Sequence, residues 1–459
     1  MEFINKYSLC LVLFLLISQV ALTQDVLNNY IQQGLENNLA LKQKTADYKI
    51  KMAELREAKG MFFPSLSVNA RYSVADGGRE ISIPVNTMLS GYSQYNNLIN
   101  PGLNLMVPGE IKDETIPFMR PKEHETKLRL TQSLFNTDIY YNRKIKEEFS
   151  LISKADEMSY KRQLIKEIKT AYYQYLITLE VEEVLFSTRE LINELIRVNE
   201  RLYTNNKVTI DKVYKAEAEL NKLEKKISET QKNKMSARNY FNYLLNKELN
   251  SEVQVDSLDD ITPSTKQLAE LKNNALESRE ELEMLSHYES LSEKNIKMQK
   301  GHQLPDLIAV VDYGFQGEEY QFTGDDDFVM ANFVLSWDLF KGFQNKARIQ
   351  QAKIEKKKIE DKHRQTEKLV QLEVVQAYYG VVSSVKSLDA ARSEKKSTQK
   401  VFKLVKRQYE EGMVNLLEYL DAQNALTEAK QNFIISKYNL LIAKAELERA
   451  AGLYTFSEN

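Results

Sequence analysis

Four short segments of the chain alternate between apolar and polar residues. A period of two is typical of a β-strand with one apolar and one polar face. In the first segment, Leu66, Val68 and Tyr72 share one face, while Asn69 and Arg71 share the other. An ordinary amphipathic sheet packed on helices would give the same pattern. The alternation predicts strands at about 64–75, 124–135, 305–316 and 327–340.

Between and after these strands the chain lacks helix breakers over long distances. No proline occurs from residue 122 to 262 or from 306 to 459. Since proline in a helix interior costs a hydrogen bond and clashes with the preceding turn, such stretches can form unbroken helices. A helix of this length, at about 1.5 Å per residue, reaches roughly 100 Å, which suits a coiled-coil tower or tunnel. The predicted helices span 137–203, 209–247, 344–409 and 415–451.

The chain also repeats itself. Pro64 and Pro305 lie 241 residues apart, and Tyr203 and Tyr409 lie 206 apart. The 35-residue difference indicates an insertion in the first copy. We expect a first repeat over 24–262 and a second over 263–459, with the insertion forming a long outer loop at 76–121, which holds five of the eight prolines.

Each repeat contains a helix reversal. In the second, Gly412 suits the left-handed backbone that ends a helix, and Asn415 can cap the next one. The first repeat has no glycine there, but Asn206 tolerates the same backbone conformation better than most residues. Downstream, Glu418 and Asp421 lie three apart and share a helix face. They are either ordinary exposed carboxylates of a helix start or, in an oligomer, a charged ring.

Composition narrows the function. The chain has 459 residues, 42% hydrophobic and 28% charged, and a formal net charge of −2, which gives no indication of nucleic-acid binding. Residues 1–23 have the features of a secretory signal and include the only cysteine, Cys10. Beyond residue 24 no apolar stretch is long enough for a transmembrane helix, although the alternating strands of a β-barrel escape that test.

No enzyme or cofactor signature is evident. His124, His287, His302 and His363 are isolated in the sequence and are interpreted as surface residues rather than metal ligands. Phosphate-loop, serine-hydrolase and zinc-protease motifs are absent from the sequence. We therefore expect no catalytic site, no bound metal and no cofactor.

Four amphipathic strands cannot close a barrel in lipid, so copies of the chain must complete it. Two copies would give eight strands and a filled interior, whereas three give twelve and a lumen. The polar lumen residues would then be Arg71, Lys127, Arg129 and Asp338. Aromatic residues that suit a membrane interface gather at the strand ends, among them Phe63, Trp337 and Phe340.

Several motifs resemble the TolC-like outer-membrane efflux proteins of Gram-negative bacteria. They are Leu-Glu-Asn-Asn at 35, Pro-Ser-Leu at 64, Trp-Asp-Leu-Phe-Lys-Gly at 337, Ala-Tyr-Tyr at 377, and Tyr-Glu-Glu-Gly at 409 followed by Leu-Glu-Tyr-Leu-Asp-Ala-Gln at 417. The resemblance implies an α+β membrane protein, a homotrimer with a twelve-stranded transmembrane barrel continued by a twelve-helix periplasmic tunnel. It further implies a periplasmic adaptor protein and an inner-membrane pump as partners, with outer-membrane lipid around the barrel.

The resemblance also implies site residues. Tyr409, Glu418 and Asp421 would form the tunnel entrance, although Gln408 stands where the family usually has arginine. The adaptor would contact the reversals at Asn205, Asn206, Val208, Gly412, Val414 and Asn415. The expected function is passive export of small molecules or polypeptides. The alternatives are a periplasmic coiled-coil adaptor, which would need one hairpin and compact β-domains, and an enzyme of cell-envelope metabolism.

Overall fold

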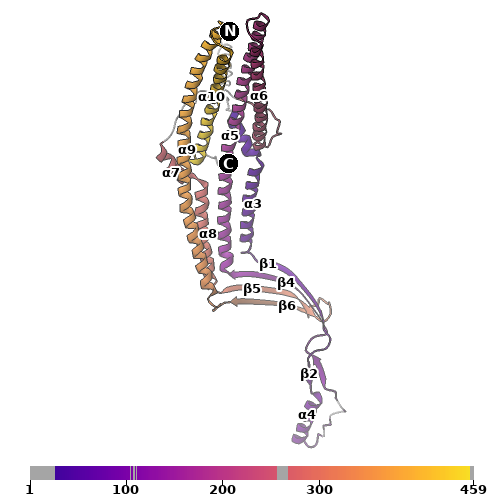
Figure 1. Ribbon diagram of the computed structural model, residues 1–459. Helices are drawn as coiled ribbons and strands as arrows, with labels where there is room; N and C mark the ends of the chain where they lie inside the picture. Colours follow the sequence, from indigo (N-terminus) through magenta and orange to yellow (C-terminus); the bar gives the residue numbers. More distant parts are fainter. Residues whose placement is uncertain (1–25, 104, 107–108, 110, 256–266, 455–459) are drawn as a thin grey trace, which may run out of the picture. The chain divides into compact units, whose positions relative to one another are not determined.

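The computed structural model describes residues 26–454 except 104, 107–108, 110 and 256–266 (Figure 1). The predicted signal segment and the predicted repeat boundary at 262/263 lie outside the described residues. The chain divides into two compact units, one of residues 54–146 and 294–353, the other of the remainder. We call the first the sheet unit and the second the helical unit.

The sheet unit contains a four-stranded antiparallel sheet in the order β1-β4-β5-β6. Its strands are β1 Ser65–Val74, β4 Lys122–Phe135, β5 Asp306–Gly317 and β6 Asp327–Ser336. Strand β6 ends before the predicted residue 340, and the chain turns into the next helix through Gly342 and Phe343, which both have positive φ. A register shift between Ser133 and Phe135 leaves Leu134 as a bulge in β4.

Much of the segment 76–121 forms regular secondary structure and not a loop. It contains β2 Glu80–Ile83, α4 Val85–Ile99 and β3 Glu114–Pro117, with β2 and β3 paired antiparallel. Pro84 and Pro101 flank a proline-free stretch, so the prolines delimit a helix here and do not indicate irregular chain. The prediction of a loop was wrong because it rested on the count of prolines without their positions.

The helical unit is built on two long helices, each followed by a shorter antiparallel one. The first pair is α5 Thr137–Thr204 with α6 Asp211–Leu244, and the second is α9 Gln344–Glu410 with α10 Leu416–Ala450. Within residues 26–454, where described, the other helices outside the 76–121 insertion are α2 Val26–Asn37, α3 Leu39–Gly60, α7 Leu268–Ser278 and α8 Glu280–Gly301. Helices α3, α5, α8 and α9 each contribute residues to both units.

Buried residues along the helices recur three, four or seven positions apart. In α5 these are Leu185, Thr188, Ile192, Leu195 and Asn199. In α9 the corresponding run is Val370, Val374, Ala377, Val381 and Leu388. This spacing keeps one narrow stripe facing a neighbouring helix, as in coiled coils. Among the described residues, none of the helices combines the length and apolarity needed to cross a membrane.

Candidate functional site: the hairpin tips and the polar face of the sheet

The two helix reversals have the same backbone geometry. At the first tip, Asn206 has φ +53°, and its N–H donates to the Tyr203 carbonyl at 2.8 Å. At the second tip, Gly412 has φ +74°, and its N–H donates to the Tyr409 carbonyl at 3.0 Å. These bonds satisfy carbonyls that a helix end otherwise leaves unpaired. The prediction that asparagine can replace glycine at the first tip is confirmed.

The start of the following helix differs between the tips. Asn415 caps α10: its side-chain oxygen accepts from the Glu418 N–H at 3.1 Å, and its Nδ2 donates to Glu418 Oε1 at 2.9 Å. Ile210 occupies the cap position of α6 and makes no side-chain cap bond. The side chains of Thr209 and Asp211 hydrogen-bond to each other nearby. The second tip therefore has a capping interaction that the first lacks.

Tyr409 joins the second tip to α5 through a side-chain hydrogen bond. Its hydroxyl donates to Oδ1 of Asn199 on α5 at 2.9 Å, and Asn199 is fully buried. Asn199 in turn donates to the Leu195 carbonyl at 2.8 Å. Burial raises the pKa of Tyr409, and the bond to Asn199 lowers it in part. The side-chain pairing was not predicted, because the sequence does not show which residue of α5 faces Tyr409.

Tyr419 packs beside Tyr409, with ring centroids 5.0 Å apart, and beside Phe402 at 5.5 Å. Burial raises the pKa of Tyr419 to about 12. Leu195, Ala216, Leu416 and Leu420 belong to the same apolar cluster, which thus includes residues from α5, α6, α9 and α10.

The predicted charged residues of this tip are on its surface. Glu418 is held by Asn415, and Glu418 and Asp421 are both exposed, as are Asn205, Asn206, Gly412 and Asn415. Val208 and Val414 are half-buried. The tips consequently offer accessible polar groups beside a buried aromatic cluster.

On the sheet, the predicted polar face is a ladder of ion pairs. Arg129 makes two bonds of 2.8 Å to Asp312, which is fully buried. Lys127 lies 2.5 Å from Glu125 and 3.7 Å from Asp312. Arg71 reaches Glu123 at 3.4 Å and Glu125 at 3.9 Å. The register places these side chains on one face, because Arg71 is opposite Glu125 and Arg129 is opposite Asp312.

The cations of this ladder are therefore neutralised. The sequence carried the signal, since Glu123, Glu125, Lys127 and Arg129 follow one another at the two-residue spacing of one strand face. Gly314 lies opposite Lys127, and a Cβ there would come within 2.6 Å of Lys127 Cβ and 2.4 Å of the Thr126 carbonyl oxygen. A residue without a side chain thus makes room for Lys127.

The remaining predicted residues lie beyond the strand ends. Asp338 comes two residues after β6 and pairs with Lys341. Phe63, Trp337 and Phe340 are largely exposed, and Trp337 donates its indole N–H to the Gln303 carbonyl at 3.0 Å.

His124 corrects the interpretation of the histidines as surface residues. It is fully buried, with Tyr320 stacked on its ring at 4.4 Å between centroids. Tyr320 comes from the short connection between β5 and β6, a long-range contact that the local sequence does not reveal. His287, His302 and His363 each contact a carboxylate, at 2.7, 2.8 and 2.7 Å. Among the described residues no cluster could hold a metal ion.

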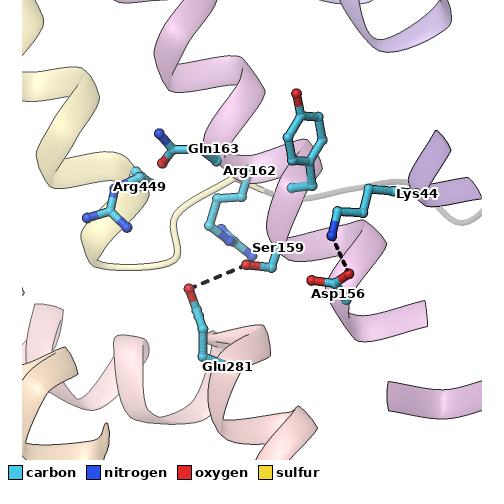
Figure 2. Close-up of a pocket in the computed structure, with 8 residues that line it drawn as sticks. Lys44, Asp156, Ser159, Arg162, Gln163, Glu281 and Arg449 are labelled. Carbon is cyan, nitrogen blue, oxygen red and sulfur yellow. Dashed lines mark hydrogen bonds and ion pairs between the residues drawn. The ribbon is translucent and has the colours of Figure 1, made fainter. Parts of the chain in front are cut away.

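The helical unit has a cavity of about 260 Å³ that is lined by residues of α3, α5, α8 and α10. Figure 2 shows the side chains that line it. Its charged side chains are paired: Lys44 with Asp156 at 2.7 Å, and the nearly buried Arg162 with Glu280 at 2.6 Å. Burial raises the pKa of Glu281, but the Arg279 guanidinium more than offsets this, and the net pKa is lowered. The Arg162–Glu280 pair joins α5 of the first half of the chain to α8 of the second, so we interpret the cavity as part of a structural joint.

Comparison with known proteins agrees with this architecture. Residues 271–453 match the family described as "Outer membrane efflux protein". The chain is 21% identical over 448 residues to Outer membrane protein TolC of Salmonella enteritidis, covering 92% of this chain and 80% of that protein.

Two solved structures are similar over nearly the whole chain. A membrane protein from Pseudomonas aeruginosa has a TM-score of 0.75 and 19% identity, covering 94% of both chains. The Campylobacter jejuni CmeC outer membrane channel has a TM-score of 0.76 and 17% identity, covering 93% of this chain and 86% of that one. At these identities the likeness establishes the fold.

Proposed function

This chain is a TolC-like protein of the outer membrane efflux family, and from that premise we propose that it is the outer-membrane exit channel of a tripartite efflux or type I secretion system. Three copies would assemble, dock to a periplasmic adaptor protein and receive cargo from an inner-membrane pump. The cargo would be small molecules or polypeptides, and their passage through the channel would be passive.

The observation that carries the proposal is the unfinished sheet. Within the described residues, β1 and β6 each pair with one strand only. The face opposite the ion-pair ladder exposes large apolar side chains, such as Val68 at 69% and Phe333 at 72%. Unpaired strand edges are not tolerated in lipid. Three copies joined edge to edge would give twelve strands, enough to enclose a lumen, with the apolar face toward lipid.

The helix pairs support the second part of the channel. Helix α5 has 68 residues, about 100 Å at 1.5 Å per residue. Three copies of the two helix pairs would form a twelve-helix tunnel in the periplasm. The order α3-β1-β4-α5-α6 followed by α8-β5-β6-α9-α10 supports the duplication into repeats 24–262 and 263–459.

We assign the gate to the second tip. The Tyr409 hydroxyl holds the tip against α5 through Asn199. Threefold symmetry would bring Glu418 and Asp421 of each copy near one axis, where like charges repel one another and attract cations. The tip residues Asn205, Asn206, Val208, Gly412, Val414 and Asn415 would contact the adaptor.

In the lumen, Arg71, Lys127 and Arg129 would be balanced by Glu123, Glu125 and Asp312. Ion preference would therefore arise at the tips rather than in the barrel. Asp338 would lie at the inner rim, and Phe63, Trp337 and Phe340 would contact the membrane interface. A periplasmic adaptor remains the alternative, but the exposed apolar sheet face has no use in an aqueous compartment.

Single-channel recording in planar bilayers tests the proposal. The purified trimer is expected to conduct and to prefer cations. The double variant Glu418→Gln, Asp421→Asn should lower the cation-to-anion permeability ratio at least about twofold, because it removes the charged ring. Asp389→Asn removes an exposed carboxylate of α9, away from the tip; it is the matched control and should change nothing. Inserted protein that never conducts would rule out the channel.

A further inference from the structure

Helix α4, within the 76–121 insertion, has its exposed and covered faces reversed relative to an ordinary surface helix. Met88, Tyr92, Tyr95 and Ile99 form one stripe and are 55% to 66% exposed. The parallel stripe of Asn86, Ser90, Ser93 and Asn97 is half-buried. Both stripes follow the spacing of a single helix face. Here the polar stripe faces the protein and the apolar stripe is open.

The contacts of the polar stripe explain this orientation. Ser93 Oγ donates to the Leu105 carbonyl at 2.6 Å, and Asn97 both donates to that carbonyl at 3.0 Å and accepts from the Leu105 N–H at 2.8 Å. Two polar side chains of α4, Ser93 and Asn97, are thus used to fix the helix to the chain that follows it. This attachment leaves the apolar stripe on the opposite, exposed face of the helix.

The region around α4 is also free of charge. No Asp, Glu, Lys, Arg or His occurs between Glu80 and Glu110, in a chain in which 28% of residues are charged. Desolvating an ionised side chain is costly, so a segment without any can enter a membrane interface that a charged segment cannot. Tyrosine, with an apolar ring and a polar hydroxyl, is enriched at such interfaces.

The backbone connects this segment directly to the sheet. Beyond the pair Val74 and Lys122, Ala75 donates to the Pro121 carbonyl at 2.9 Å, and Phe118 donates to the Arg79 carbonyl at 2.9 Å, which leads into the β2–β3 pair. The backbone hydrogen bonding between β1 and β4 therefore continues through the β2–β3 pair to the start of α4. The apolar face of β1 and β4 is the one proposed to contact lipid. At 15 residues, α4 is too short to span a bilayer.

We propose that α4 is an interfacial helix that lies on the outer leaflet of the outer membrane, with Met88, Tyr92, Tyr95 and Ile99 inserted among the lipids. This inference rests on the proposed function, since it requires the sheet to be embedded in lipid. It makes the insertion a membrane-surface anchor of the barrel, and the occupant of the apolar stripe is a lipid surface.

Fluorescence quenching tests the orientation. In a Cys10→Ser background, which leaves no other cysteine, single cysteines at Met88, Tyr95 or Ile99 are labelled with an environment-sensitive dye in the full-length protein in nanodiscs. Thr87→Cys and Gln94→Cys, exposed positions outside the stripe, are the matched controls. Doxyl-labelled phosphatidylcholine should quench the stripe positions at least about twofold more than the controls, and aqueous iodide should show the reverse order.

Two other outcomes would overturn the inference. Stripe positions protected from both quenchers would indicate that a second copy of the chain covers them, and stripe positions quenched mainly by iodide would indicate that the helix stands in water. Val68→Cys, on the apolar face of the sheet, separates this failure from a failure of the proposed function. If lipid quenches Val68→Cys but not the stripe, only the interfacial helix is excluded; if it quenches neither, the membrane-embedded sheet is excluded as well.

Discussion

The two hairpin tips reverse the chain with the same backbone and different side chains. Asn206 at one tip and Gly412 at the other take the same left-handed conformation and make equivalent hydrogen bonds. Only the second tip has a capped helix start, at Asn415, and a tyrosine hydroxyl bonded to a buried partner, at Tyr409. The comparison teaches that the turn itself requires one permissive residue, whereas attachment of the tip to the bundle requires specific side chains.

The largest expected effect comes from substituting the residue with positive φ at each turn, because the two turns should then respond with opposite changes in stability. Gly412→Val places a β-branched side chain at φ +74° and should destabilise the second tip by about 2 kcal/mol. Asn206→Gly relieves the same strain at the first tip and should leave it unchanged or slightly more stable. Hydrogen exchange followed by mass spectrometry over residues 405–422 and 199–216 reads out both. Unchanged exchange in Gly412→Val would show that the left-handed turn is not required.

The hydroxyl of Tyr409 provides the next largest effect. Tyr409→Phe removes the hydrogen bond to Asn199 and leaves the buried side-chain oxygen of Asn199 without this donor. The loss should lower the stability of the second tip by about 1 to 2 kcal/mol. Tyr203→Phe, at the equivalent and 45% exposed position of the first tip, is the control and should have no effect. Faster exchange confined to the second tip would support the assignment. Equal responses at both tyrosines would contradict it.

The helix starts of the two tips can be compared by substitution. Asn415→Ala should cost about 1 kcal/mol at the start of α10, because the Glu418 N–H loses its acceptor. Ile210→Asn should change little, because Ile210 has helical backbone angles (φ −60°, ψ −24°), whereas a capping residue such as Asn415 has an extended backbone. Amide exchange in the first turn of each helix measures both variants, and only Asn415→Ala should lose protection. A loss of protection in both variants would mean that the cap is not what distinguishes the tips.

The remaining effect is a pH dependence that appears only outside the physiological range. Burial raises the pKa of Tyr419 from its usual value near 10 to about 12, so the folded tip holds this proton more tightly than the unfolded chain does. Its contribution to stability is complete below pH 10 and is lost as the pH rises toward about 12. Thermal unfolding followed by circular dichroism should show this loss in the wild type. Tyr419→Phe should reduce it, and an unchanged profile would contradict the role of Tyr419.

The elements that the sequence predicted best depend on local chemistry. The left-handed Asn206 follows from the tolerance of asparagine for that conformation, and β1 and β4 follow from alternation along a few residues. Helix α4 was missed, although Met88, Tyr92, Tyr95 and Ile99 carry a helical spacing, because the prolines around it dominated the interpretation.

Partners that are distant in the sequence could not be predicted. The pairing of Arg129 with Asp312 depends on the register between β4 and β5, and the pairing of Tyr409 with Asn199 depends on the rotation of α5 about its axis. Neither register nor rotation is set by the residues near the pair. The burial of His124 beneath Tyr320 is a third case, since the covering ring arrives from another connection.

Gly314 has a consequence for anyone who wishes to redesign the electrostatics of this sheet. Lys127 occupies the space that a side chain at 314 would need. A methyl group there would meet the backbone carbonyl oxygen of Thr126 and the Cα and Cβ atoms of Lys127, so β4 and β5 would have to separate locally and Lys127 would move without the loss of any ionisable group. The placement of one charge is in this way encoded by a neutral residue on the adjacent strand, and a search restricted to acidic and basic positions would overlook it.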